Sequence, residues 1–96
     1  MLNGKQKRYL RALASKEKAL FQIGKEGIND NFIDLLKSAI KARELIKISI
    51  LKTCDLEANE VAIDLAAASN SEIVQIIGRT IILFKQSKEK KIVLPK

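Results

Sequence analysis

Two glycines three positions apart, Gly24 and Gly27, stand between a short apolar stretch and a segment with helical periodicity. Glycine permits a positive φ and lets another backbone approach closely. The first N–H groups of the following helix have no partner within it, and the helix dipole attracts anions there. The loop could therefore bind a phosphate through its backbone. The alternative is a plain turn that joins a strand to a helix.

The charge of the whole chain favours the phosphate interpretation. The 96 residues carry 18 lysines and arginines against 11 acidic residues, a net charge of +7, which is typical of proteins with an anionic partner. The glycine-rich fingerprints of mononucleotide and dinucleotide sites are absent, whereas a G-x-x-G loop clamps the RNA backbone in KH-type domains. We therefore expect RNA contacts from Gly24, Lys25, Glu26 and Gly27. Glu26 would repel a phosphate unless its side chain points away.

Further cations are candidates for the same partner. Lys7, Arg8 and Arg11 share the polar face of a predicted helix, and Arg79 follows Gly78 in a predicted turn. A solvated face and ordinary turn polarity are the alternatives. Beside the loop and the net charge, phosphate contact is favoured. The other expected RNA-binding residues are Lys5, Lys7, Arg8, Arg11 and Arg79.

Base stacking and catalysis are both disfavoured. The aromatic residues lie in apolar patterns and are predicted to be core, so recognition by backbone and shape fits better: Tyr9, Phe21, Phe32 and Phe84. Cys54 has no histidine partner anywhere in the chain, which excludes a Cys–His nucleophile and ordinary zinc sites. Glu60 and Asp64, four apart on a predicted helix, fit an exposed face better than an acid–base pair or a metal site. We predict no enzyme activity, cofactor, metal or small-molecule substrate.

The compartment is predicted from the same composition. A single cysteine cannot form an internal disulfide, which fits a reducing environment. No apolar run approaches the roughly 20 residues of a membrane span, and the first residues lack the apolar region of a signal peptide. We expect a cytoplasmic protein without a membrane partner.

Periodicity divides the chain into alternating elements. Helices are predicted over 4–14, 29–43 and 56–69, with Asn3 and Asn29 as N-caps. Strands are predicted over 19–23 and 44–52, and residues 72–85 read as two strands divided at Gly78. The helix over 29–43 has a predicted buried stripe, and alternate isoleucines should share one face of the strand over 44–52. The stripe is Phe32, Leu35, Leu36, Ala39 and Ile40, and the isoleucines are Ile46, Ile48 and Ile50.

These elements predict one α/β domain over residues 1–96. Strands alternate with helices early and pair locally late, so the sheet should be mixed and partly parallel. The two basic ends, 1–20 and 73–96, should meet on one side of the fold, while the acidic stretch 57–72 faces elsewhere. The apolar Ile92-Val93-Leu94 should dock on the body.

Four ordered motifs resemble a known family. They are Lys5-Gln6-Lys7, the I-G-x-x-G-I of 23–28, the E-L-I-K-I of 44–48 and the I-I-G-R-T-I-I-L-F of 76–84. Together with the final KEKKIVLPK they resemble the CRM domain family, named for chloroplast RNA splicing and ribosome maturation, in its small bacterial YhbY-like form. The chain departs from the family pattern mildly, with Phe84 where tyrosine is usual and Glu26 in place of a neutral or basic residue.

The resemblance implies both a fold and a function. The fold is three helices on a four-stranded mixed sheet, similar to the C-terminal domain of bacterial initiation factor three. The function is binding to ribosomal RNA in precursors of the large ribosomal subunit. By this likeness Gly24–Gly27 is the RNA-contacting loop and the basic face of the first helix flanks it. The rival hypothesis is a non-enzymatic adaptor that docks an acidic protein and never touches RNA.

Overall fold

Three helices form where the apolar periodicity predicted them. In the computed structural model, which describes residues 2–95, they are α1 (Gly4–Ala14), α2 (Asp30–Arg43) and α3 (Ala58–Ser69). The prediction for α1 is confirmed at both ends, and those for α2 and α3 began one and two residues early. Met1 and Lys96, which the predicted domain included, lie outside the described residues.

Both predicted N-caps are confirmed. The side chain of Asn3 accepts a hydrogen bond from the N–H of Gln6, whose own side chain accepts one from the N–H of Asn3. This reciprocal capping box satisfies two N–H groups that the helix itself cannot pair. The side chain of Asn29 accepts from the N–H of Phe32 at 2.8 Å. Local sequence therefore determines where α1 and α2 begin.

The four strands form one mixed sheet, as predicted. They are β1 (Phe21–Ile23), β2 (Leu45–Ile50), β3 (Glu72–Ile77) and β4 (Thr80–Phe84), in the spatial order β1-β2-β4-β3. β1 pairs with β2 in parallel, and the remaining neighbours are antiparallel. β1 and β2 are shorter than predicted. Gly78, at φ +56°, lies in the turn between β3 and β4, where a positive φ favours glycine.

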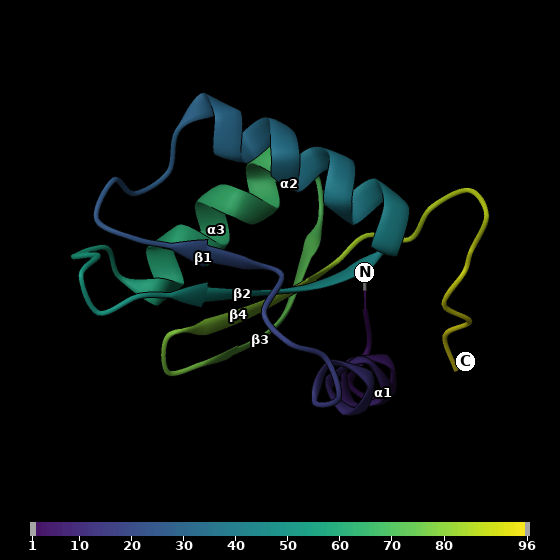
Figure 1. Ribbon diagram of the computed structural model, residues 1–96. Coiled ribbons are helices and arrows are strands. Elements are labelled where there is room, and N and C mark those ends of the chain that lie inside the picture. The colour runs from purple at the N-terminus through teal and green to yellow at the C-terminus, as the bar shows by residue number, and fades with distance from the viewer. Residues whose placement is uncertain (1, 96) are drawn as a thin grey trace.

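The helices cover the two faces of the sheet unequally. Figure 1 shows α2 and α3 on one face and α1 alone on the other. Ile46, Ile48 and Ile50 are buried on the α2–α3 face, as predicted. The alternate residues of β4, Ile82 and Phe84, are buried with α1. The sheet therefore separates two apolar cores.

The chain ends meet on the α1 face. The Nε2 of Gln6 donates to the carbonyl oxygen of Pro95 at 3.0 Å, and Ile92 and Leu94 pack against the core beneath α1. In Figure 1 the C-terminal segment, drawn in yellow, passes the end of α2 and descends toward α1. The two chain ends therefore meet on this face, but their cations do not gather on one side as predicted, since Lys85 and Lys88 line a hollow with Lys41 of α2. The predicted docking holds for Ile92 and Leu94 but is wrong for Val93, which is exposed.

Two predicted core residues are exposed. The side chain of Tyr9 is 40% exposed, because α1 buries only a narrow stripe of Leu10 and Ala14. Leu35 is 51% exposed, because α2 is covered along Leu36 and Ile40 and not along its neighbouring face.

The other aromatic residues belong to the cores, as predicted. Phe84 is buried, and the half-buried rings of Phe21 and Phe32 meet edge to face at 5.4 Å. No helix within residues 2–95 combines the length and apolarity needed to cross a membrane.

Candidate nucleic-acid interface

The Gly24–Gly27 loop forms a tight turn between the edge strand β1 and the start of α2. The N–H of Gly27 donates to the carbonyl oxygen of Gly24 at 3.0 Å. Gly27 has φ +71°, a conformation that side-chain-bearing residues rarely adopt, whereas Gly24 has no such requirement. The loop therefore has the geometry of a tight turn, and only its second glycine is required by backbone conformation.

The turn still leaves donors for an anion. Within residues 2–95, the N–H groups of Lys25 and Glu26 take part in no hydrogen bond, and both residues are exposed. The first N–H groups of α2 have no intrahelical partner, and the side chain of Asn29 occupies only that of Phe32. A phosphate at this position could accept hydrogen bonds from the turn and meet the positive end of the helix dipole.

The turn is held by the neighbouring loop between β2 and α3, residues 51–57. The N–H of Leu51 donates to the carbonyl oxygen of Ile23 at 2.8 Å. A Cβ placed on Gly24 would lie 3.6 Å from the Cδ1 of Leu51, and one on Gly27 would lie 3.6 Å from the Cδ1 of Leu56. These are ordinary van der Waals distances, so the two loops pack closely without crowding.

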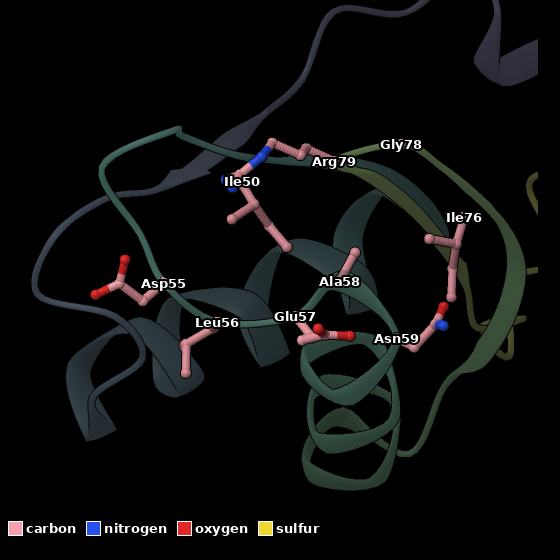
Figure 2. Close-up of a pocket in the computed structure, with 9 residues that line it drawn as sticks. All are labelled: Ile50, Asp55, Leu56, Glu57, Ala58, Asn59, Ile76, Gly78 and Arg79. Atoms are coloured by element: carbon pink, nitrogen blue, oxygen red, sulfur yellow. The ribbon is translucent and has the colours of Figure 1, made fainter.

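Arg79 lies at the same end of the sheet, in the turn between β3 and β4. Its guanidinium donates to the carbonyl oxygen of Leu51 at 2.8 Å and, more weakly, to that of Cys54 at 3.4 Å. Its own carbonyl oxygen accepts from the N–H of Ile50 at 2.7 Å. Figure 2 shows the Arg79 side chain reaching across to β2. Arg79, predicted as a phosphate contact, thus also holds the 51–57 loop in place.

Two hollows flank these loops. One, of about 410 Å³, lies beside the Gly24–Gly27 turn and includes Gln22, Phe32 and the exposed Leu35 in its lining. The other, of about 440 Å³, lies at the start of α3 and is drawn in Figure 2. Glu57, the N-cap residue of α3, makes no side-chain capping bond.

Charge at this end of the sheet is mixed. The basic residues of the loops and adjoining helix starts are Lys25, Lys52 and Arg79. The acidic ones in the same segments are Glu26, Asp30, Asp55, Glu57 and Glu60. An anion here would therefore be held by backbone N–H groups rather than by a local excess of cations.

The cations of α1 form a separate group. Lys7, Arg8 and Arg11 are exposed, as their predicted polar face requires, and Lys5 is exposed as well. They belong to a helix that packs on the face of the sheet opposite to α2, whose start carries the turn (Figure 1). The Nζ of Lys47 on β2 donates to the carbonyl oxygen of Ala14 at 3.4 Å and so holds the end of α1 beneath the sheet. The predicted residues thus occupy two surfaces.

The structural role of Glu44, whose side chain accepts several hydrogen bonds, was not predicted from the sequence. The residue was predicted to begin a strand, but it ends α2 with φ +67° and is completely buried. Its carboxylate accepts from the N–H groups of Ser87, Lys91 and Ile92 at 2.8, 3.1 and 2.6 Å, and from the hydroxyl of Ser87. No local pattern indicated this role, because the donors follow more than 40 positions later.

The hydrogen bonds decide the ionisation of Glu44. Burial raises the pKa of the Glu44 carboxyl, but the bonds from the Ser87 hydroxyl and from the N–H groups of Ile92, Ser87 and Lys91 lower it. The net pKa lies below the ordinary value, so the group is charged at neutral pH. A charged carboxylate accepts stronger hydrogen bonds than a neutral one.

Comparisons with known proteins agree with this architecture. Residues 2–85 match the CRS1 / YhbY (CRM) domain. The chain is 52% identical over 91 residues to "Probable RNA-binding protein YqeI" of Bacillus subtilis, covering 95% of both chains. It is 29% identical to an "RNA-binding protein" of Haemophilus influenzae, covering 99% of this chain and 96% of the other. The solution structure of a hypothetical protein from Staphylococcus aureus superposes with a TM-score of 0.82 at 48% identity, covering 99% of this chain and all of that one.

Proposed function

Because the chain belongs to the CRS1 / YhbY (CRM) domain family, we propose that it is an RNA-binding protein that grips the RNA backbone through the Gly24–Gly27 turn. The observation that carries the proposal is the turn itself, which directly precedes a helix and leaves the N–H groups of Lys25 and Glu26 unbonded within residues 2–95. The description of the relatives as RNA-binding proteins supports the choice of ligand.

The exposed cations extend the proposed interface. Lys5, Lys7, Arg8 and Arg11 would add phosphate contacts from α1, and Lys25 and Arg79 would add them at the turn. Each neutralised phosphate releases counterions, so RNA affinity should fall steeply with salt. Glu26 is compatible with this arrangement when its exposed side chain points into solvent.

The proposed RNA is ribosomal RNA in the precursor of the large subunit. This follows from the likeness to the YhbY-like form of the family and makes the protein a non-enzymatic ribosome assembly factor in the cytoplasm. It is tested by asking whether the protein co-sediments with large-subunit precursors at low salt. Sedimentation only with mature particles, or with none, would reject this part and leave RNA binding itself intact.

The turn is tested by a pair of variants at Gly24. A Cβ at this position meets only ordinary contacts, so Gly24→Asp can add a negative charge without forcing the backbone, as it would at Gly27. The added carboxylate should repel a bound phosphate and weaken its hydrogen bonds to the turn. Loss of one hydrogen bond to a charged phosphate costs about 1.5–3 kcal/mol, which is roughly a ten- to hundredfold loss of affinity. Gly24→Ala is the matched control and should bind RNA like the parent.

The measurement is fluorescence anisotropy of a structured ribosomal RNA fragment, with a DNA duplex as competitor and circular dichroism as the test of folding. Equal RNA affinity for folded Gly24→Asp and Gly24→Ala would remove the turn from the mechanism. Absence of any RNA preference in the parent protein would reject the proposed function as a whole.

A further inference from the structure

A second group of lysines lies along the second half of α2 and just beyond its end, away from the Gly24–Gly27 turn. Lys37 and Lys41 come from α2, Lys85 directly follows β4, and Lys88 belongs to the C-terminal segment. Two hollows, of about 430 and 260 Å³, are both lined by Lys41 and Lys85. Lys88 lines the first and Lys37 the second. Two segments distant in sequence, α2 and the segment after β4, thus bring their cations to one surface.

Glu44 holds the segment that carries Lys85 and Lys88 against the end of α2. Its carboxylate holds the N–H and hydroxyl of Ser87, and its main-chain oxygen accepts from the N–H of Lys85 at 2.8 Å. These bonds fix the backbone on both sides of Ser87, so Lys85 and Lys88 are held next to the end of α2. The Nζ of Lys91 adds a hydrogen bond to the carbonyl oxygen of Ala42 at 2.8 Å. The segment that carries the lysines is therefore anchored to the helix.

The stability of the fold does not explain why these four lysines lie together. The negative end of the helix dipole favours cations in the last turn of α2, which explains Lys41 but not the addition of Lys85 and Lys88. Like charges four apart on a helix, such as Lys37 and Lys41, repel each other. Within residues 2–95 the sole ion pair is that of Lys91 with Glu89, at 3.8 Å, so none of the four lysines forms one. Glu89 also lines the first hollow, where it is one carboxylate beside three lysines.

We propose that Lys37, Lys41, Lys85 and Lys88 form a second contact surface for the RNA phosphate backbone. This inference rests on the proposed function, because it assigns a further surface to the same ligand. α2 has 14 residues, so its end next to Lys41, Lys85 and Lys88 lies about 20 Å from the turn, with Lys37 about midway. An RNA shorter than this reaches only one of the two surfaces. A longer, folded RNA reaches both, so the protein prefers RNA of that size.

The test compares two RNAs and two double variants. The short RNA is a single strand of about four nucleotides, the length that a G-x-x-G loop clamps. The long RNA is a hairpin whose stem exceeds the length of α2. Lys41→Ala with Lys88→Ala removes two exposed cations from the second surface. Lys16→Ala with Lys18→Ala removes the same charge from the exposed segment after α1 and is the matched control.

Anisotropy titrations at several salt concentrations give the outcome. Lys41→Ala with Lys88→Ala should weaken hairpin binding about tenfold and reduce the slope of log affinity against log salt by roughly 1.4–1.8, from two lost contacts. Its binding of the short RNA should match that of the control. Hairpin affinity and slope equal to those of the control would overturn the second surface.

The two proposals fail in different ways. If Gly24→Asp weakens binding of both RNAs while Lys41→Ala with Lys88→Ala weakens binding of neither, the second surface is overturned and the proposed function stands. If the parent protein binds neither RNA, the proposed function and the second surface are both rejected. If only the hairpin is affected by the lysine variant, the second surface is supported.

Discussion

The carboxylate of Glu44 accepts a hydrogen bond of 2.6 Å from the N–H of Ile92, 48 positions further along the chain. Glu44 ends α2, and Ile92 lies in the segment that returns to the core beneath α1. One buried carboxylate therefore connects the helices on the two faces of the sheet. It also fixes the segment that carries the C-terminal lysines.

Replacing Glu44 by alanine should release the C-terminal segment. The N–H groups of Ser87, Lys91 and Ile92 would lose their acceptor, and an unsatisfied buried polar group costs roughly 1–3 kcal/mol. We expect the free energy of unfolding to fall by more than about 2 kcal/mol in urea titrations, since some freed groups will find water. Hydrogen exchange should accelerate over 85–92. Glu89→Ala removes an exposed carboxylate and should change stability by less than about 0.5 kcal/mol.

Glu44 should also make stability depend on acid pH. Its pKa in the folded protein is lowered from 4.5. The unfolded chain therefore takes up a proton at higher pH than the folded protein does. The stabilisation is complete above that ordinary value and is lost as pH falls through the lower folded pKa. Urea midpoints of the parent and of Glu44→Gln should converge as the solution is acidified below about pH 4.5. A difference between them that stays constant with pH would contradict this assignment.

The two glycines of the turn should respond differently to alanine. Gly27 has φ +71°, and a left-handed conformation costs an L-residue roughly 1–2 kcal/mol. Gly24→Ala meets only a van der Waals contact with Leu51 and should leave stability within about 0.5 kcal/mol. Thermal unfolding of the two variants side by side measures the contrast. Equal destabilisation would mean that the backbone at Gly24 is restricted as well.

Arg79→Lys separates the structural role of Arg79 from its charge. A lysine keeps the positive charge but cannot reproduce the fork that reaches the carbonyl oxygens of Leu51 and Cys54. We expect a loss of about 0.5–1.5 kcal/mol in the free energy of unfolding. RNA affinity should fall only slightly if binding depends on the positive charge at this position. A large loss of affinity with unchanged stability would instead assign a specific guanidinium contact.

Local signals in the sequence were sufficient for the helices and for the chain reversal at Gly78. The helical spacing of Gln6, Tyr9, Leu10 and Leu13 with the Asn3 cap placed α1 correctly, because both signals act within one or two turns of helix. Alternation of Ile46, Ile48 and Ile50 predicted which face of β2 is buried. The strand ends were less accurate, because a strand extends only as far as its partner pairs with it.

Burial at single positions depended on neighbours that the local pattern does not contain. Leu35 fits the apolar stripe of α2 by spacing, yet half of its side chain is exposed. In the sequence Glu44 resembles any exposed charged residue, yet its carboxylate accepts hydrogen bonds from N–H groups of the C-terminal segment. Contacts between residues this far apart form only when the whole chain is folded.

The sequence by itself determined the family, the order of the elements, the G-x-x-G turn and the excess of positive charge, because each depends on residue types at short spacing. The tertiary structure decided how that charge is distributed. It assigned the α1 cations to one face of the sheet, left mixed charge around the turn, and gathered Lys37, Lys41, Lys85 and Lys88 along the second half of α2 and just beyond its end. Charges from distant segments become neighbours only through the packing of the elements that carry them, and Glu44 holds the last of these segments in place.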